Sequence, residues 1–402
     1  MNDTKLFKTK SEIVEAKMPR INGNNQYKTK TVVALDGGYS SVKGISPNKV
    51  FCFPSFAKKA PDGLEIIGKA RPDDLMYRDD DSGQVWIVGR TAENLMDADD
   101  INSTTDASLF TRYRYESDVY KVIMGTGLAL GLSGTKEAGE IYLQTGLPSA
   151  YKDKDEERLK NALARHYNIS LKVGNGEWRK FVFDLPKENI GVMEQPQGTL
   201  CAAAYINGTV SPEGKKVLQS KGTIILDIGF GTEDIFSIRS GFKNGHQTYS
   251  DTGMKSVFEQ TIKHAKEETD SDLDVKVFEL QSYLESGVLS YFNVDEFKTD
   301  DIDFSDILYA SNRQLCDKSI RRLMQEYNNL SGYEYLIVTG GTGESRYEQI
   351  KEMLGGIRSL TILPGNINIP DYSFMYSNVY GYYMFRYSNL CAELRKKGLM
   401  EK

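Results

Sequence analysis

The sequence predicts an α/β protein built from two domains, and three observations support this prediction. The chain has 402 residues, which is more than one hydrophobic core of ordinary size holds. Short apolar runs typical of buried strands alternate with longer, charged stretches typical of amphipathic helices. Two of the strand-like runs end in an aspartate followed by a glycine-rich turn, at Asp36 and at Asp227. Two similar domains, each opening with such a turn, would produce this spacing.

Composition argues against several classes of protein. The formal net charge of −6 argues against a broad basic face for DNA, so direct nucleic-acid binding is not expected. Three histidines without metal-ligand spacing argue against a zinc site or a Ser-His-Asp hydrolase, and four scattered cysteines indicate buried thiols. Residues 1–22 lack an apolar core, and Val122–Gly134 is too short to span a bilayer. We therefore expect a soluble, cytoplasmic protein that binds no membrane.

Residues 1–30 are predicted to form a mobile, basic N-terminal tail. They carry seven Lys or Arg residues against three Asp or Glu residues, and few side chains suited to packing. A contact with a neighbouring subunit or an acidic partner is the alternative, and the composition does not separate the two.

The first predicted phosphate-binding turn follows the strand Thr31–Leu35. The next residues, Asp-Gly-Gly-Tyr-Ser-Ser-Val-Lys, lead into another extended stretch and so indicate a hairpin. Glycines let backbone N–H groups approach an anion, hydroxyls add donors, and a lysine on the returning strand reaches β- and γ-phosphates as a point charge. The candidate residues are Asp36, Gly37, Gly38, Ser40 and Lys43.

A second hairpin of the same kind is predicted from the strands Thr223–Leu226 and Ile235–Ile238. Asp227, at the end of the first strand, is placed to hold a hydrated Mg²⁺ or to orient a water molecule. An ordinary hairpin with glycine turn chemistry is the alternative. The candidate phosphate-binding residues are Gly229, Phe230, Gly231 and Thr232, and Asp234 closes the turn.

A Glu-Gln-Pro-x-Gly segment connects the predicted strand Ile190–Met193 to the small-residue helix Thr199–Tyr205. Either Glu194 or Gln195 would orient an attacking water from this helix start. A capped helix N-terminus without catalytic role is the alternative.

Two glycine-containing turns suit the rest of a nucleotide. The glycine-containing loop from Asp251 to Lys255, before the predicted helix Val257–Lys266, suits a phosphate or ribose at a helix N-terminus. The strand Tyr335–Thr339 is followed by a turn and the helix Tyr347–Leu354, and a flat base can lie against such a turn because no side chain intervenes. The glycines of this turn are Gly340, Gly341 and Gly343.

The remaining segments are predicted in less detail. Residues 54–115 read as a small inserted subdomain with short strands at Glu65–Ile67 and Val85–Gly89 and acidic turns. Residues 270–330 read as largely helical. A helix is predicted at Tyr115–Leu130, a core strand at Glu140–Leu147 and a tyrosine-rich helix at Asn378–Leu390.

Four motifs together resemble the superfamily of actin, sugar kinases and DnaK-type ATPases. They are the first phosphate motif (Leu35–Lys43), the connecting segment (Glu194–Tyr205), the second phosphate motif (Leu226–Asp234) and the adenosine motif (Val338–Glu344). Within it the chain looks most like the plasmid-segregation actins of the ParM/StbA group, by the Gln195-Pro196-x-Gly-Thr199 connection and the run Ser377–Tyr383. The resemblance extends roughly from Thr31 to Arg386.

The resemblance implies a two-domain actin-like fold. Each domain would hold a mixed sheet with a ribonuclease H-like core flanked by helices, and the nucleotide would lie in the cleft between the domains. Domain I would comprise residues 31–215 and 370–398, with the inserted subdomain, and domain II residues 216–369.

The resemblance also implies an ATPase that forms filaments with nucleotide bound and disassembles after hydrolysis, segregating plasmid DNA. Asp36 and Asp227 would hold Mg²⁺ through water, and ATP or GTP would be the nucleotide. Asp227 with Glu194 or Gln195 would carry the catalysis. The implied partners are further copies of the chain and a DNA-binding adaptor at a centromere-like plasmid site.

Two other functions remain open at this point. One is a small-molecule kinase of the same superfamily, which needs an acceptor pocket with a catalytic aspartate. The other is a nucleotide-binding cytoskeletal scaffold with little turnover. Sedimentation with and without ATP separates a filament former from a kinase, and phosphate release separates an ATPase from a scaffold.

Overall fold

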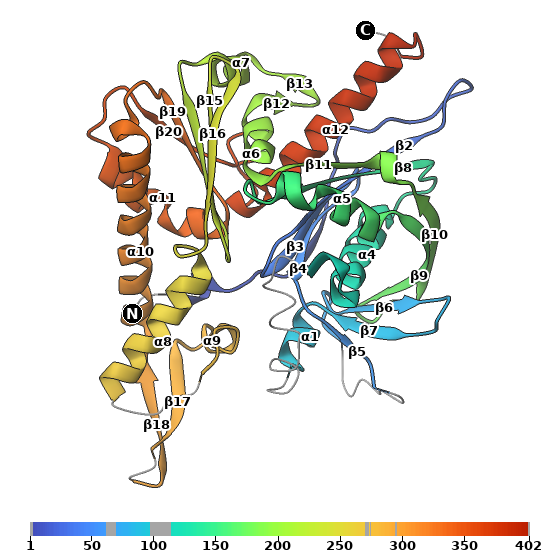
Figure 1. Ribbon diagram of the computed structural model, residues 1–402. Coiled ribbons are helices and arrows are strands. Elements are labelled where there is room, and N and C mark those ends of the chain that lie inside the picture. The colour runs from blue at the N-terminus through green and yellow to red at the C-terminus, as the bar shows by residue number, and fades with distance from the viewer. Residues whose placement is uncertain are drawn as a thin grey trace. The chain divides into compact units, whose positions relative to one another are not determined.

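The structure is a computed structural model that describes residues 3–61, 70–96, 114–269, 273, 275–293 and 296–400. The chain divides into two compact units (Figure 1). Unit 1 contains residues 1–9, 217–365 and 373–375, and unit 2 contains residues 10–216, 366–372 and 376–402. Each unit is a mixed α/β structure, which confirms the predicted fold class.

The main sheet of unit 2 has six strands in the order β1-β4-β3-β2-β8-β11. β2 runs parallel to β8, and β8 parallel to β11, whereas β3, β4 and β1 follow by antiparallel pairing. The strands are β1 (Glu12–Glu15), β2 (Lys30–Gly37), β3 (Ser41–Ile45), β4 (Lys49–Pro54), β8 (Glu140–Leu147) and β11 (Ile190–Glu194). β8 has the predicted bounds. β2 is almost continuously buried because its apolar run lies inside the sheet.

Among the described residues of unit 2, four longer helices pack together: α4 (Asp118–Leu132), α5 (Lys152–Leu163), α6 (Gln195–Ala204) and α12 (Ser377–Lys396). α6 and α12 cross where a Cβ on Gly381 would lie 1.7 Å from the carbonyl oxygen of Gly198, so only glycine fits there. At the same crossing the Thr199 hydroxyl donates to Asn378 Oδ1 over 2.8 Å. α6 begins at Gln195, earlier than predicted, because Pro196 and a capping box start the helix directly after β11. Shorter elements are α1 (Arg90–Asn94), η3 (Arg114–Glu116), η4 (Lys187–Asn189), β12 (Tyr205–Ile206), β13 (Thr209–Val210) and α7 (Pro212–Gln219).

A second sheet of unit 2 has the order β10-β9-β6-β7-β5. Its strands are β5 (Ala57–Lys59), β6 (Leu75–Asp79), β7 (Val85–Val88), β9 (Arg165–Val173) and β10 (Arg179–Leu185). The predicted insertion at 54–115 thus supplies only part of this sheet, because β9 and β10 come from later in the chain. The predicted strand Glu65–Ile67 lies outside the described residues. Trp86 is buried here, and the Arg78 guanidinium lies 4.9 Å from the ring of Trp178.

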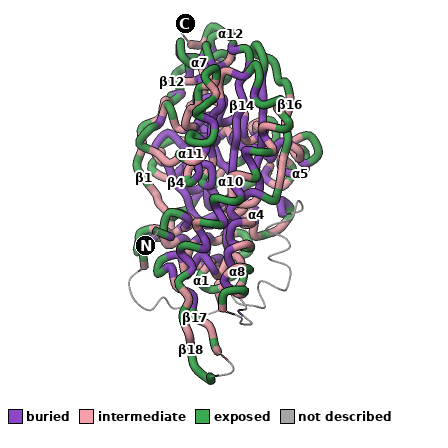
Figure 2. The backbone as a smooth tube through the Cα atoms, turned by 90° about the vertical axis from the view of Figure 1, so that its left-hand side faces the viewer, coloured by how far each residue is buried: buried purple, intermediate pink, exposed green. Residues whose placement is uncertain are grey.

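The sheet of unit 1 has the order β16-β15-β14-β19-β20. Its strands are β14 (Thr223–Ile228), β15 (Glu233–Arg239), β16 (Phe242–Tyr249), β19 (Tyr335–Thr339) and β20 (Thr361–Pro364). β14, β19 and β20 run parallel, and β15 and β16 follow β14 by antiparallel pairing. The principal helices are α8 (Met254–Thr269), α10 (Ser305–Glu326) and α11 (Gly341–Leu354), with α9 (Leu280–Tyr283), η5 (Asn328–Leu330) and η6 (Phe374–Tyr376) as short elements. Figure 2 shows the strand β14 buried.

The structure differs from the largely helical prediction for residues 270–330. β17 (Val288–Asn293) and β18 (Lys298–Asp303) pair as an antiparallel hairpin, much of which is exposed (Figure 2). The alternation of apolar and polar residues at Leu289, Tyr291 and Ile302 places one face of the hairpin toward the core of unit 1. The many charged residues of this segment obscured the alternation of apolar and polar residues in the sequence.

The structure also differs from the predicted mobile N-terminal tail. In unit 1, η1 (Thr4–Phe7) packs Phe7 into a core cluster, edge-to-face with Tyr309, and Lys8 donates to Glu285 over 2.8 Å. In unit 2, β1 pairs with β4. A few apolar side chains therefore anchor a segment whose composition is mostly polar.

None of the helices within the described residues is both long and apolar enough to cross a membrane.

Candidate functional site

The first candidate turn lies between β2 and β3 in unit 2, where Asp36 pairs in register with Lys43. Asp36 is 5% exposed, and its Oδ2 lies 3.5 Å from the Lys43 ammonium. Its Oδ1 accepts a hydrogen bond from Gln195 Nε2 over 2.8 Å. The structure therefore brings together three predicted residues from two separate motifs, and Lys43 offers a positive charge beside the turn.

The glycines of this turn are required by close contacts. A Cβ on Gly38 would lie 2.7 Å from the Lys43 Nζ atom, and one on Gly37 would lie 2.9 Å from the Tyr120 hydroxyl. A side chain at position 38 would therefore displace the lysine that the turn presents. Ser40 is partly exposed, and its carbonyl accepts from the Ser55 backbone N–H over 3.0 Å, which fixes the end of the turn.

Arg114 is a residue of this turn that the sequence did not reveal. It is 3% exposed, its Nη1 donates to the carbonyl of Gly38 over 3.0 Å, and its Nη2 donates to the carbonyl of Gly37. Its guanidinium lies 4.2 Å from the ring of Tyr39. Arg114 therefore fixes two peptide groups of the turn and adds buried positive charge. No recognisable spacing marks it, because it lies far along the chain in the segment read as an inserted subdomain.

Glu194 and Gln195 have different surroundings. Glu194 forms a capping box with Gln197 at the start of α6. Its side chain accepts from the Gln197 backbone N–H, and its own backbone N–H donates to Gln197 Oε1 over 3.3 Å. Gln195 instead reaches Asp36. Of the two residues that the sequence left open, Gln195 therefore has its amide at the first candidate turn, whereas Glu194 satisfies the helix N-terminus.

The second candidate turn lies between β14 and β15 in unit 1, where Asp227 pairs in register with Asp234. The Gly229 N–H donates to the Thr232 carbonyl over 2.8 Å and closes the turn. Asp227 is 7% exposed and Asp234 is 1% exposed. Thr248 donates to Asp234 Oδ1 over 2.5 Å, so Asp234 is occupied within the sheet.

The N-termini of two helices meet this turn. At the start of α11, the Thr342 hydroxyl donates to the Gly229 carbonyl over 2.8 Å. At the start of α8, the backbone N–H groups of Met254 and Lys255 donate to the carbonyls of Gly229 and Phe230 over 3.3 Å and 2.9 Å. Helix N-termini carry partial positive charge, so the turn lies in a field that favours an anion.

Two glycines make this arrangement possible. Gly340 has φ of +82°, and a Cβ there would lie 2.3 Å from the Ile228 carbonyl oxygen and 2.7 Å from Asp227 Oδ1. A Cβ on Gly253 would lie 2.5 Å from the Phe230 carbonyl oxygen. Because Gly340 acts as the N-cap, α11 starts at Gly341, six residues before the predicted helix start. Gly341 borders open space, and Gly343 packs at ordinary distance on Val338.

The Asp251 carboxylate binds two basic side chains of α10. Its carboxylate accepts two hydrogen bonds from Arg322, at 2.7 and 2.9 Å, and lies 2.8 Å from the Lys318 ammonium. Although burial alone would raise the pKa of Asp251, the bonds from Arg322 and Lys318 lower it to about 2. Lys255 contributes its backbone N–H to the turn, and its ammonium lies 3.8 Å from Glu259. The structure therefore places the backbone of this loop, rather than the Asp251 carboxylate, at the turn.

The aspartates suit a hydrated magnesium ion better than a metal held by protein alone. Across the described ranges, no group of three or more His, Cys, Asp or Glu side chains is arranged to hold a metal. Asp36 and Asp227 are single, nearly buried carboxylates at strand ends. Mg²⁺ keeps several waters and takes one or two carboxylates together with substrate phosphates, so each of these carboxylates by itself suits it.

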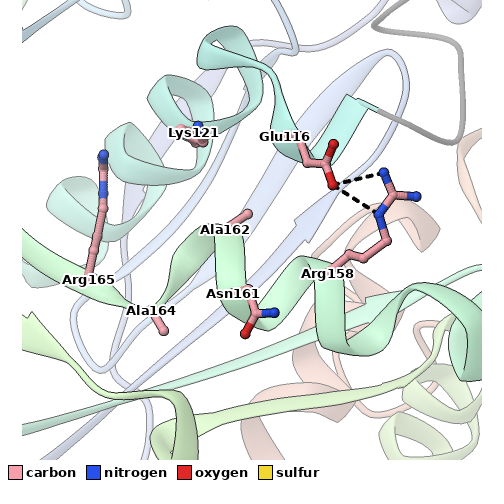
Figure 3. Close-up of a pocket in the computed structure, with 7 residues that line it drawn as sticks. All are labelled: Glu116, Lys121, Arg158, Asn161, Ala162, Ala164 and Arg165. Carbon is pink, nitrogen blue, oxygen red and sulfur yellow. Dashed lines mark hydrogen bonds and ion pairs between the residues drawn. The ribbon is translucent and has the colours of Figure 1, made fainter.

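A hollow of about 440 Å³ elsewhere in unit 2 contains none of the predicted site residues (Figure 3). Its cations already have partners. Arg158 donates twice to Glu116, Lys121 lies 3.8 Å from Asp118, and Arg165 donates to the Tyr77 hydroxyl over 3.3 Å. This hollow is therefore not the candidate site.

Comparison with known proteins identifies the fold. Residues 34–198 match the sequence model of a family described as the N-terminal domain of actin-like proteins. A non-polymerisable quadruple mutant of pCBH ParM aligns with 90% of this chain and 99% of its own, at 18% identity and a TM-score of 0.68. A 15-stranded ParM filament from Clostridium botulinum gives the same coverage and identity with a TM-score of 0.67. An archaeal actin homologue in complex with ADP aligns with 89% of this chain and 99% of its own, at 17% identity and a TM-score of 0.58.

No curated protein sequence matches the chain. The chain has the actin-like, ParM-type fold, which confirms the resemblance drawn from the four motifs.

Proposed function

We propose that this protein is an actin-like ATPase that assembles into filaments with bound nucleotide and disassembles after hydrolysis. The observation that carries the proposal is the pair of turns, each at the end of a buried strand and each beginning with a nearly buried aspartate. The fold adds support, since similar structures include a filament and an ADP complex.

In unit 2, the turn binds phosphate through charge. Lys43 contributes its ammonium, the backbone of Gly37 and Gly38 and the Ser40 hydroxyl contribute donors, and Arg114 keeps the turn in shape. Gln195 orients the attacking water, because its amide already lies at Asp36. Glu194 is the alternative for this task.

In unit 1, the turn binds phosphate through backbone. Gly229, Phe230, Gly231 and Thr232 surround the anion at the N-termini of α8 and α11. Lys255 lies on the side of the ribose with Asp251 holding its loop to α10, and the base lies against Gly340, Gly341 and Gly343.

Asp36 and Asp227 would hold Mg²⁺ through water, and the ion would supply neutralisation of the charge on the β- and γ-phosphates. Phosphoryl transfer needs mainly positioning and charge neutralisation, which these residues provide. Loss of the γ-phosphate on hydrolysis would be coupled to a change in subunit contacts. The function served would be plasmid segregation in the cytoplasm, with a DNA-binding adaptor at a centromere-like site.

High-speed pelleting with Mg-ATP, with Mg-GTP and without nucleotide, with phosphate measured in the same tubes, tests this proposal. Pelleting that needs nucleotide and precedes phosphate release is the expected result. Phosphate release from protein that stays soluble would contradict filament formation and favour a kinase. Pelleting without phosphate release would favour a scaffold.

A further inference from the structure

A cluster of buried polar side chains lies beside the phosphate turn of unit 1. It consists of Glu233 on β15, Thr252 before α8, Asn312 and Ser319 on α10, and Arg346 on α11; we call it the Glu233–Arg346 cluster. Glu233, Thr252, Ser319 and Arg346 have no exposed surface, and Asn312 is 6% exposed. None of these five residues belongs to the predicted phosphate, ribose or base contacts.

A buried glutamate and arginine contribute little to stability compared with apolar residues of similar volume, because each charge loses its hydration. Their presence in the core therefore indicates a role other than stability. A buried charged group orients the polar groups around it, so this role involves the groups that Glu233 and Arg346 contact.

Arg346 connects three elements. Its Nε donates to Asn312 Oδ1 on α10 over 2.8 Å, and its Nη1 donates to the Thr252 carbonyl over 2.8 Å. The next residue, Gly253, packs against the Phe230 carbonyl, and the two N–H groups that follow donate to the phosphate turn. Arg346 thus holds the loop that in turn holds the phosphate turn.

Glu233 faces the same volume from the other side of the turn. Burial raises its pKa, against the opposing influence of the Ser319 and Thr252 hydroxyls and of the Arg346 and Arg322 guanidinium groups. Within the described residues, neither Glu233 carboxyl oxygen has a partner in hydrogen-bond geometry, and the same holds for Arg346 Nη2, Thr252 Oγ1 and Ser319 Oγ. The cluster therefore contains buried donors as well as buried acceptors that have no hydrogen-bond partner among the described residues. Glu233 is also the residue that directly follows Thr232 of the turn in the sequence.

We propose that Arg346 and Glu233 are positioning residues for the nucleotide phosphates: they hold loop 251–253 and the turn 229–232 in the register that phosphate binding requires, without touching the nucleotide. This inference rests on the proposed nucleotide binding. Lysine cannot replace Arg346, because a single ammonium group cannot reach Asn312 and the Thr252 carbonyl in the same fork geometry.

The test compares R346K and E233Q with wild type and with R239K. Arg239 is an exposed arginine of unit 1 that lies 4.6 Å from the ring of Tyr333, away from the cluster, so R239K is the matched control. The measurements are the dissociation constant of fluorescently labelled Mg-ADP, the KM and kcat of phosphate release, and the melting temperature without nucleotide.

We expect R346K to weaken Mg-ADP binding by about tenfold or more, the loss that follows removal of one hydrogen bond to a charged group. E233Q should weaken binding by about threefold to tenfold, since the amide keeps the shape of the carboxyl group but replaces one oxygen with an NH₂ donor. In both variants the effect should fall on KM, with kcat within about twofold of wild type, because Asp227 and Gln195 are unchanged. R239K should behave as wild type.

A purely structural role would lower the melting temperature and leave the affinity and KM of the folded protein unchanged. If wild type binds Mg-ADP and both variants bind it equally well, the inference is overturned. If R346K does not fold, E233Q decides: an unchanged KM overturns the inference. If wild type itself does not bind Mg-ADP, the proposed function fails instead.

Discussion

The two candidate turns share a backbone design but differ in the source of their positive charge. Each follows a buried strand, β2 or β14, that has a parallel neighbour on one side and returns antiparallel on the other. In unit 2 the residue opposite the aspartate is Lys43, and Arg114 lies behind the glycines. In unit 1 the opposite residue is Asp234, and the turn meets two helix N-termini.

If both turns bind phosphate as proposed, the same backbone shape attracts an anion by side-chain charge in one unit and by peptide dipoles in the other. A charged side chain can be removed by substitution, whereas peptide dipoles remain as long as the helix starts stay in place. We therefore expect anion binding at the turn of unit 2 to be sensitive to loss of positive side-chain charge, and anion binding at the turn of unit 1 to be sensitive to added side-chain bulk at its glycines.

The largest expected effect is that of D227A. Removing this carboxylate should slow phosphate release by about 100-fold or more, the range seen when one group that stabilises charge in a transition state is lost. Filament formation with Mg-ATP should be largely retained, so the variant should pellet without releasing phosphate. D301A, at an exposed hairpin residue whose carboxylate accepts from the Ser290 hydroxyl, is the control. Unchanged ATP turnover in D227A would contradict the assignment.

G340A tests the dependence of unit 1 on backbone shape. A methyl group there meets the Ile228 carbonyl and Asp227, and the positive φ adds strain, so we expect a loss of about 1–3 kcal/mol in the free energy of unfolding and weaker nucleotide binding. G341A, which borders open space at the first residue of α11, should cost nothing or stabilise slightly. Urea unfolding of both variants checks this, and equal losses would refute the argument.

K43A against K255A tests the source of charge directly. K43A should raise the KM for ATP by about tenfold, since the turn loses a partly buried ammonium that would pair with the phosphates. K255A should raise it by less than about threefold, because that residue contributes its backbone N–H and its ammonium is already near Glu259. Equal effects would mean that both turns depend on side-chain charge.

The smallest expected effect is that of D251N. The pKa of Asp251 is lowered to about 2, against about 3.9 in an unfolded chain, so its ion pairs stabilise the folded protein above about pH 4 and lose that effect as the pH falls toward 2. Because the carboxylate is half exposed, the loss in D251N at pH 7 should stay below about 1 kcal/mol. Urea unfolding of wild type and D251N should differ at pH 7 and converge at low pH. Nucleotide affinity should change by less than about twofold, and a larger loss would place Asp251 at the ribose after all.

The sequence was a good guide where the determinants are local. Glu140–Leu147 and Tyr335–Thr339 have the predicted bounds. An unbroken apolar run defines the second strand, and the apolar triplet Ile141–Leu143 marks the first. The two hairpins that contain Asp36 and Asp227 also form as predicted, because each turn lies between two strand-like runs.

The sequence was a poor guide where the determinants are tertiary. Arg114 and Arg346 donate hydrogen bonds to backbone carbonyls that are distant in the sequence, and no residue spacing predicts that an arginine is buried. Phe7 anchors a segment whose composition is that of a tail, and the β17–β18 hairpin has its period of two masked by charge. In each case packing against distant residues overrides the local pattern.

The sequence contains two tryptophans, Trp86 and Trp178, and both belong to unit 2. Indole emission therefore reports on one half of the molecule, while circular dichroism, which follows all helices and strands, reports on both. Coincident denaturation midpoints by the two optical signals would mean that the halves melt as one cooperative block. A gap between the midpoints would measure, without any label, how independently they unfold.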